Sequence, residues 1–351
     1  MKSLAPAYLD RLTFSSQDAR SIRRLGEARG QQKLFSRQRP EVLEDLRTVA
    51  AVESSESSNR LEGIQAPKDR IEALVLKETM PQGRSEQEIA GYRDALDLIH
   101  QSADEMRFTV NVVRQLHKTL FAYLPEPGGD WKAADNEIVE RASDGSVARV
   151  RFVAVPAVAT PGAMDDLTAQ YRAAVESEVH DPLVLVPLTI LDLLCIHPFR
   201  DGNGRVARLL TLMLLYHFDY RVGRFISLER IFEESSDSYY ETLEASSQGW
   251  HEGKHDVFPW MRYFWGVLLK AYSEFEERVG TITEGRGSKT DQVRAAVGRL
   301  VKPFAISELQ RLTPGVSKEM VRHVLRQMRD EGILRSEGTG RGARWRRVDD
   351  E

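Results

Sequence analysis

The chain has 351 residues, of which 41% are hydrophobic and 29% charged, an ordinary composition for a globular protein of two or three domains. Its single cysteine, Cys195, excludes an intramolecular disulfide, and we expect a reducing, cytoplasmic location. The sequence shows neither a signal-like apolar segment at its start nor an apolar run of about 18 residues, so we expect no secretion and no membrane partner.

The charge is divided unevenly along the chain. Residues 286–351 carry 15 Lys and Arg against 9 Asp and Glu, a net charge of +6, whereas the rest of the chain has a net charge of −10. A basic C-terminal segment on an acidic body suggests that this segment has a partner of its own.

The first 63 residues are predicted to be helical. Helices are expected around residues 17–30 and 40–51. Residues 51–63 then read as a separate, short polar helix that ends at Gly63, a residue suited to a left-handed C-cap. On its charge pattern alone, this short helix is a solvated face.

Two amphipathic helices and a hairpin follow. Residues 85–103 and 109–124 repeat apolar side chains at helical spacing, and we expect His117 to be packed or on the surface rather than a ligand. Residues 138–153 change to a strand pattern around Ser143-Asp144-Gly145, and Asp-Gly favours a tight turn. A β-hairpin is therefore predicted, with a purely structural role as one reading of it.

Two further helices lead to the most informative stretch. One is expected over residues 161–179, and Asp181-Pro182 supplies a cap and first residue for the next. This second helix is apolar through Ile196, and Pro187 is expected to kink it or to delay its start.

A polar cluster then lies on a tight turn that opens a core helix. Residues 197–208 read HPFRDGNGRVAR. Gly202-Asn203-Gly204 can point successive backbone N–H groups into one concavity at the positive end of the helix dipole, which makes an anion site. Arg205 and Arg208 share a helix face and add charge-assisted hydrogen bonds.

Two side chains of this turn suggest chemistry beyond anion binding. Asp201 beside the anion site suggests a divalent ion, most plausibly Mg²⁺, and His197 can take a proton near neutral pH. A glycine-rich turn that merely joins two core helices is the alternative. The convergence of six polar residues favours phosphoryl or nucleotidyl chemistry.

The C-terminal part is predicted to form a separate module. Helices are expected over residues 235–248 and 257–279, and residues 281–288 read as a linker. The remaining segment, 289–351, suggests three helices and then two strands that flank the glycine-rich residues 338–342.

This pattern resembles a winged helix-turn-helix, in which the third helix enters the DNA major groove. Five basic residues are candidate DNA contacts: Lys318, Arg322, Arg326, Arg341 and Arg344. A protein-binding or purely structural module is the alternative.

The turn also resembles the signature of the Fic (filamentation-induced-by-cAMP) family, His-Pro-Phe-x-Asp-Gly-Asn-Gly-Arg-x-x-Arg, at every specified position. A looser resemblance extends from about Ser57 to Trp265. It implies a mainly α fold, a Fic-type helical bundle with a small β-hairpin flap, followed by the C-terminal winged helix-turn-helix. The implied domains are a helical region over 1–105, a catalytic domain over 106–280, the linker over 281–288 and the winged helix over 289–351.

The resemblance implies a protein adenylyltransferase that moves AMP from ATP to a Ser, Thr or Tyr hydroxyl of a target protein, and of itself. His197 would take the hydroxyl proton, and Asp201 would hold Mg²⁺. The implied nucleotide contacts are Glu62, His197, Gly202, Asn203, Gly204, Arg205, Val206, Ala207, Arg208 and Tyr240. Arg205 and Arg208 would meet the β- and γ-phosphates, and Phe199 would anchor the turn in the core.

Tyr240 lies 43 positions after His197, where Fic enzymes commonly place an aromatic residue beside the adenine. A stacked base is worth roughly 1–3 kcal/mol. A core tyrosine is the other interpretation of this residue.

The resemblance also implies an inhibitory helix at about residues 51–63. Ser58-x-x-x-Glu62-Gly63 matches the inhibitory Ser/Thr-x-x-x-Glu-Gly/Asn motif of Fic proteins. Glu62 would pair with Arg208 and take the place of the γ-phosphate. The target protein would bind along the flap, at about residues 138–153.

Two other functions stay open at this point. Glu62 could instead position water for removal of AMP, or the protein could be an ATP-sensing regulator that binds DNA through 289–351. A homodimer is also left open by the sequence.

Overall fold

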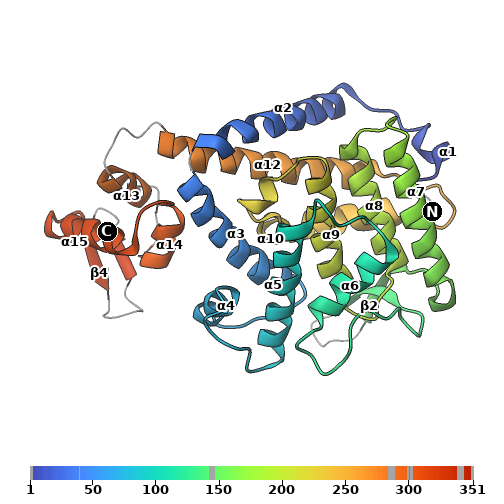
Figure 1. Cartoon of the computed structure of the whole chain (residues 1–351), viewed down its shortest axis with the longest axis horizontal. Helices are drawn as coiled ribbons and strands as arrows, with labels where there is room; N and C mark the ends of the chain where they lie inside the picture. The colour runs from blue at the N-terminus through green and yellow to red at the C-terminus, as the bar shows by residue number, and fades with distance from the viewer. Residues whose placement is uncertain are drawn as a thin grey trace. The chain divides into compact units, whose positions relative to one another are not determined.

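The computed structural model describes residues 3–38, 40–141, 147–283, 289–298, 300, 303–337 and 344–348 (Figure 1). These residues form helices and two small sheets, which confirms the predicted mainly α fold. Contacts divide the chain into two compact units, Met1–Gln31 with Ala50–Ala271, and Gln32–Val49 with Tyr272–Glu351. None of the described helices is long and apolar enough to cross a membrane.

The helices and strands that belong wholly to the first unit are α1 (Pro6–Leu9), α4 (Lys68–Val75), α5 (Arg84–Ser102), α6 (Val110–Leu120), β1 (Glu137–Arg141), β2 (Val147–Val153), η1 (Ala157–Ala159), α7 (Thr160–Glu176), α8 (Pro182–Ile196), α9 (Asn203–His217), η2 (Val222–Arg224), α10 (Leu228–Glu234) and α11 (Ser236–Ser247). Three helices cross the boundary between the units: α2 (Ser16–Gln38), α3 (Pro40–Arg60) and α12 (Phe258–Thr283).

The apolar helices α8 and α9 form the centre of the first unit. Nearly every side chain of α8 is buried, and α8 packs against α7 and α9 (Figure 1). Asp181 caps α8 as predicted, since its carboxylate accepts the Leu183 N–H at 2.8 Å. The turn between the two helices is therefore held at both ends by buried structure.

Pro187 lies inside α8, which begins at Pro182, so the expected delay of the helix start is wrong. A proline has no N–H to donate to the carbonyl four residues earlier, here that of Leu183. The indole N–H of Trp265 donates to that carbonyl at 2.8 Å instead. This buried tryptophan satisfies the acceptor that the proline leaves without its helical partner.

The segment that was expected to form a separate short helix from residue 51 is the end of α3, because the chain has no glycine or proline between Pro40 and Arg60. The predicted C-cap at Gly63 is confirmed by its φ of 77°. Ile64 N–H donates to Asn59 O at 3.0 Å, and Gly63 N–H donates to Arg60 O at 2.9 Å. These two hydrogen bonds form a Schellman motif, in which Gly63 is the left-handed residue at the C′ position and Glu62, just before it, is the C-cap residue of α3.

The predicted hairpin is present, and we call it the flap. Its strands β1 and β2 pair antiparallel, with Ile138 opposite Phe152 and irregular register on both sides of Val139–Glu140. Val150 and Val153 of β2 are 44% and 55% exposed. The predicted turn at Ser143-Asp144-Gly145 lies outside the described residues.

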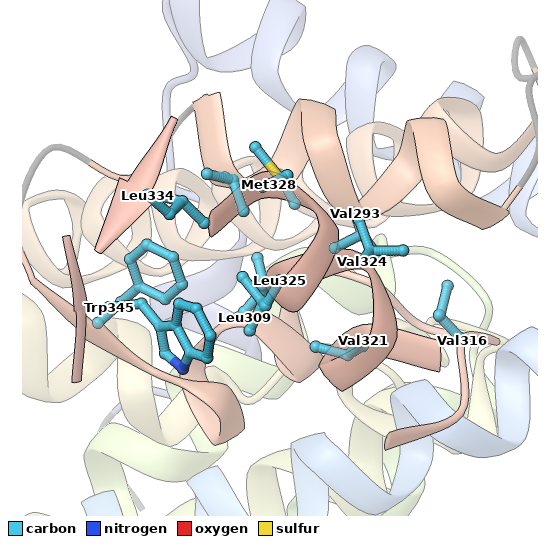
Figure 2. Packing of buried hydrophobic residues seen from close by; sticks show 12 residues of the cluster. Val293, Leu309, Val316, Val321, Val324, Leu325, Met328, Leu334 and Trp345 are labelled. Atoms are coloured by element: carbon cyan, nitrogen blue, oxygen red, sulfur yellow. The ribbon is translucent and has the colours of Figure 1, made fainter. Parts of the chain in front are cut away.

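The second unit has its own apolar core (Figure 2). Its elements are α13 (Lys289–Gly298), β3 (Phe304–Ala305), α14 (Ile306–Arg311), α15 (Lys318–Asp330), β4 (Leu334–Glu337) and β5 (Arg344–Arg347), with the strands in the antiparallel order β3-β5-β4. The three helices and two strands expected here are thus present. Residues 284–288 of the linker, the glycine-rich residues 338–342 and Arg341 lie outside the described residues.

Residues 32–49 group with the C-terminal segment rather than with the rest of the N-terminal region. Within the second unit, the carboxylate of Asp45 in α3 accepts the Gly315 N–H at 2.5 Å. This grouping by contacts does not give the domain boundaries expected from the sequence, which stay predictions.

Candidate active site

His197 ends α8 in a left-handed conformation, with φ at 51°. Its Nδ1 lies 3.3 Å from the carbonyl oxygen of Leu194. Because a carbonyl can only accept, Nδ1 carries the proton, and Nε2 keeps its lone pair. Burial, together with a smaller effect of the nearby Lys132 ammonium, lowers the pKa of His197 to about 4. The ring is therefore a neutral base at pH 7.

The turn after His197 is held by Asn203. Its side chain accepts the N–H of Phe199 at 2.9 Å and donates to the carbonyl of Phe199 at 2.8 Å. Phe199 is fully buried, which fits the predicted core anchor. The amide side chain of Asn203 thus makes its hydrogen bonds within the turn. The backbone N–H groups in the first turn of α9 are the donors that face an anion.

Two glycines are required at the start of α9. Gly202 caps the helix with φ at 79°, a conformation that favours glycine. A Cβ on Gly204 would lie 2.3 Å from the Oε1 atom of Glu62. The space in front of the helix N-terminus, where an anion is stabilised, is therefore taken by a carboxylate.

Arg208 is bound by the end of α3. Its Nε donates to the Ser58 hydroxyl at 2.8 Å, and its Nη2 donates to the Ser58 carbonyl at 2.9 Å and to the Glu62 carboxylate at 2.7 Å. Burial disfavours the charged guanidinium, but the Glu62 carboxylate together with Tyr239 and Tyr92 outweighs this and raises the pKa of Arg208. The predicted pairing of Glu62 with Arg208 is present, and the two contacts of Ser58 with Arg208 are added by the structure.

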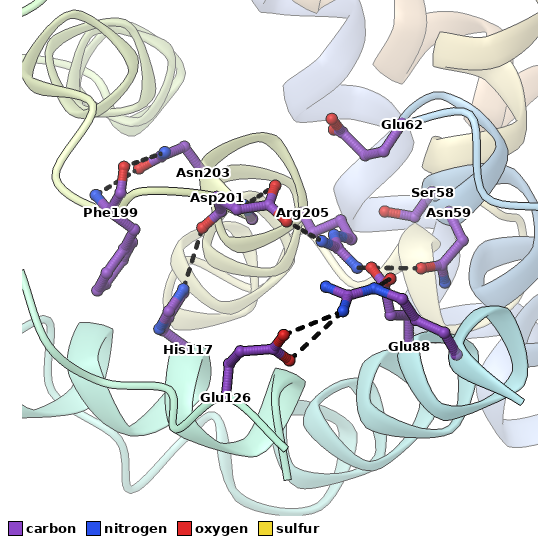
Figure 3. A network of polar contacts seen from close by, with 12 residues as sticks. Ser58, Asn59, Glu62, Glu88, His117, Glu126, Phe199, Asp201, Asn203 and Arg205 are labelled. Atoms are coloured by element: carbon purple, nitrogen blue, oxygen red, sulfur yellow. Dashed lines mark hydrogen bonds and ion pairs between the residues drawn. The ribbon is translucent and has the colours of Figure 1, made fainter. Parts of the chain in front are cut away.

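Arg205 is surrounded by the side chains of Glu88, Asp201 and Asn59 (Figure 3). Its side chain is 1% exposed and lies 2.6 Å from the Glu88 carboxylate and 3.5 Å from Asp201 and Asn59. These contacts tie α9 to α5 and α3. Phosphate binding by Arg205 stays a prediction, and the sequence did not indicate the Glu88 partner.

Asp201 is the acidic residue of the turn, and 58% of its side chain is accessible to solvent. One oxygen accepts the Gly202 N–H at 2.6 Å. The described residues contain no group of three side chains suited to a metal. Mg²⁺ is commonly held by one or two carboxylates together with substrate phosphates, so Asp201 beside the anion site fits such an ion.

His117 supports the backbone of Asp201 from α6 (Figure 3). Its Nδ1 accepts the Gly129 N–H at 2.7 Å, so Nε2 carries the proton and donates to the Asp201 carbonyl at 3.0 Å. The ring stacks on Phe199 at 3.7 Å between centroids. The expectation of a packed histidine is confirmed, with a supporting role that periodicity could not indicate.

A cavity of about 420 Å³ brings Glu62, His197, Gly204 and Arg208 together, and Asp201, Asn203 and Arg205 are not among its described lining residues. Its lining includes Glu62, Ile138, Phe152, Leu194, Cys195, His197, Gly204, Arg208, Tyr239, Tyr240 and Leu243. Tyr240 also donates from its hydroxyl to the Leu61 carbonyl at 3.1 Å. Val206 and Ala207, in contrast, are 1% exposed in the core. Arg151 and Glu244 also line this cavity, so it combines the imidazole of His197 with two guanidinium groups, two carboxylates and an apolar wall. Such a cavity suits a small polar ligand with a flat apolar part.

The sequence did not indicate the residues that brace the catalytic turn from the segment before β1. Lys132 donates from its ammonium to the Ile196 carbonyl at 3.1 Å, and Asn136 donates to the Phe199 carbonyl at 3.1 Å. A lysine and an asparagine in an irregular polar segment carry no periodic signal. Their role becomes visible only once the fold is known.

Comparisons with known proteins agree with this geometry. Residues 107–215 match the Fic/DOC family. The chain is 24% identical over 218 residues to "Protein adenylyltransferase Fic" of Nematostella vectensis, which covers 59% of this chain and 44% of that protein. The chain thus spans less than half of the length of that curated relative.

Solved structures show the same fold. A Fic family protein from Desulfovibrio desulfuricans has a TM-score of 0.62 at 18% identity, over 96% of this chain and 97% of that chain. A Fic domain containing signaling protein from Bacteroides thetaiotaomicron has a TM-score of 0.61 at 21% identity, over 76% of this chain and 99% of that chain. The chain described here therefore has the fold of these Fic proteins, and its residues 107–215 match the Fic/DOC family.

Proposed function

We propose that this protein transfers AMP from ATP to a hydroxyl group of a protein, and that Glu62 holds it in an inhibited state. The observation that carries the proposal is the Glu62 carboxylate between Gly204 and Arg208, in the cavity lined by His197. A carboxylate bound by a buried arginine at a helix N-terminus marks a site built for an anion.

The base of this reaction is His197. Nε2 takes the proton of the attacking hydroxyl, whose oxygen forms a bond to the α-phosphorus of ATP. The bond between the α-phosphorus and the oxygen that bridges to the β-phosphate breaks, and pyrophosphate leaves. The neutral ring and its fixed Nδ1 hydrogen bond suit Nε2 for this role.

The remaining groups bind and position the substrate. Arg208 and the N–H groups of the first turn of α9 hold phosphate oxygens, and Tyr240 and the apolar lining hold the adenine. Mg²⁺ bound at Asp201 would neutralise charge on the phosphates. The exposed valines of the flap support the proposal that a target segment binds along residues 138–153.

The test uses the Glu62→Gly protein with ATP labelled at either the α- or the γ-phosphate. AMP transfer predicts that the α-label enters protein and that the γ-label does not, and that His197→Ala in the same background removes the incorporation. Retention of the γ-label would identify phosphate transfer instead. No incorporation of either label, with ATP bound, would contradict the proposal.

A second candidate is removal of AMP from a modified protein. The Glu62 side chain is 29% exposed and lines the same cavity as His197, so a water molecule can reach both. Hydrolysis of a target labelled beforehand, lost on Glu62→Ala and retained on Glu56→Ala, would favour this reaction. Equal hydrolysis by both variants would exclude a role of Glu62 in it.

The second unit supports a further candidate, a regulator that binds DNA. Lys318, Arg322 and Arg326 repeat every four residues on α15 and are exposed, whereas the apolar face of α15 is buried. Such a basic helix face suits phosphate or base contacts. Duplex DNA affinity that falls with added salt and with Arg322→Ala would favour it, and unchanged affinity would argue against it.

A further inference from the structure

We propose that Lys132 is the positioning residue that holds His197 in its reactive orientation. The inference rests on the proposed function of His197 as a base. Lys132 contacts the chain on both sides of this histidine: its backbone N–H donates to the Pro198 carbonyl at 2.9 Å, and its ammonium donates to the Ile196 carbonyl at 3.1 Å. One residue thus binds the carbonyl groups of both residues that are adjacent to the base in the chain.

His197 needs such a restraint because its backbone is strained. A φ of 51° lies in the left-handed region, which is unfavourable for residues other than glycine. Strained conformations persist only where the surroundings over-determine them, and they cluster at functional sites. The two bonds from Lys132, with the Asn203 bonds to Phe199, supply this restraint on the peptides around His197.

Lys132 is itself fixed in place. Its side chain is buried, and its ammonium also donates to the Asn136 side chain at 2.7 Å. Asn136 in turn donates to the Phe199 carbonyl, and Trp131 packs against the Phe199 ring at 5.1 Å. The ammonium is therefore part of a rigid brace rather than a mobile surface charge.

The charge of Lys132 also acts on the base. Three charged groups influence His197: the Lys132 ammonium disfavours a second proton on the imidazole, whereas the carboxylates of Glu62 and Asp201 favour it. Burial lowers the pKa of Lys132 to about 8, so the ammonium is still largely charged at pH 7. Positioning and charge thus both keep Nε2 available to accept a proton.

The experiment compares Lys132→Met, Lys132→Arg and the exposed control Lys68→Met, each in the Glu62→Gly background. Lys132→Met is expected to lower the kcat for AMP transfer roughly 10- to 100-fold with little change in the KM for ATP, an effect comparable to misplacing a general base. The acid limb of the pH profile moves to higher pH because a positive charge near the base is lost. Lys132→Arg restores part of both, and Lys68→Met changes neither.

A second readout does not depend on activity. NMR of the His197 ring, one of eight histidines, reports its tautomer and its titration. Lys132→Met is expected to raise the pKa of His197 and to weaken the preference for a proton on Nδ1. If the Glu62→Gly protein transfers no AMP, the proposed function fails, while this comparison still decides the role of Lys132.

An unchanged His197 titration in Lys132→Met, with kcat within about twofold of the Lys68→Met control, would overturn the proposal. If Lys132→Met does not fold, Asn136→Ala serves instead, because it removes one anchor of the ammonium and leaves the charge. It should shift the ring signals in the same direction by a smaller amount, and no shift in that variant would equally overturn the proposal.

Discussion

The carboxylate of Glu62 lies 2.7 Å from the guanidinium of Arg208, and both side chains line the cavity that contains His197. Glu62 is fixed there by the Schellman motif that ends α3 at Gly63. The helix end therefore acts as an internal anion, and a phosphate group at the same place must displace it. The predictions below follow from this contact and from the groups that brace the turn.

Arg208→Met is expected to abolish nucleotide binding. Its buried guanidinium lines the cavity together with His197, and a methionine of similar length cannot donate to a phosphate. In the Glu62→Gly background, ATP affinity should fall at least 100-fold, measured by titration calorimetry. The exposed Arg23→Met is the control, and equal affinities in the two variants would show that Arg208 is not a phosphate ligand.

Ser58→Ala should release the inhibition in part. The Ser58 hydroxyl accepts from Arg208 Nε, so its loss frees one donor for a phosphate while the Glu62 contact remains. An increase of about 3- to 10-fold in the rate of AMP incorporation is expected, since one hydrogen bond to a charged group contributes roughly 1.5 kcal/mol. Ser57→Ala, the buried neighbour, should leave the rate unchanged.

Glu88→Ala is expected to destabilise the fold far more than Glu126→Ala. Arg84 donates to both carboxylates, but only Glu88 of the two also pairs with the buried Arg205. Removal of one partner of a buried ion pair typically costs about 3–5 kcal/mol, whereas an exposed pair contributes roughly 0–1 kcal/mol. Urea unfolding of both variants measures the difference, and similar midpoints would mean that Arg205 does not depend on Glu88.

Acid should weaken the fold through His117. Burial lowers its pKa to about 4 from the ordinary value of 6.5, so the unfolded chain binds more protons between these pH values. Stability is therefore fully present above about pH 6.5 and is lost as the pH falls toward 4, by about 2 kcal/mol between pH 7 and pH 5. His117→Gln should reduce this pH dependence in urea titrations, and an unchanged pH dependence would contradict this role of His117.

Much of the fold could be predicted because its long helices carry strong periodic signals. The amphipathic pattern of α5 and α6, the Asp181 cap of α8 and the Asp-Gly hairpin all rest on local chemistry. The junction predicted at residue 51 is wrong because a polar helix surface and a helix boundary look alike when neither glycine nor proline marks the end. The sequence therefore predicts a separate short helix where the structure has one continuous helix, α3.

The candidate site was predictable where a side chain works next to its neighbours in sequence. The turn around Gly202 and the proposed base His197 are of this kind. The pairing of Glu62 with Arg208 came from the family resemblance. Lys132 and Glu88 were not indicated, because each acts across the fold on a backbone carbonyl or a buried guanidinium. Such contacts depend on tertiary packing, and no spacing rule reports them.

The most direct test of the account is the initial rate of α-labelled AMP incorporation by the parent protein, Glu62→Gly and Glu56→Gln. Each 1.4 kcal/mol of competition between Glu62 and the triphosphate is a factor of about ten in rate. We predict that Glu62→Gly is at least tenfold faster than the parent and that Glu56→Gln, on the same helix, equals the parent. A Glu62→Gly protein that binds ATP and is no faster than the parent would contradict the account.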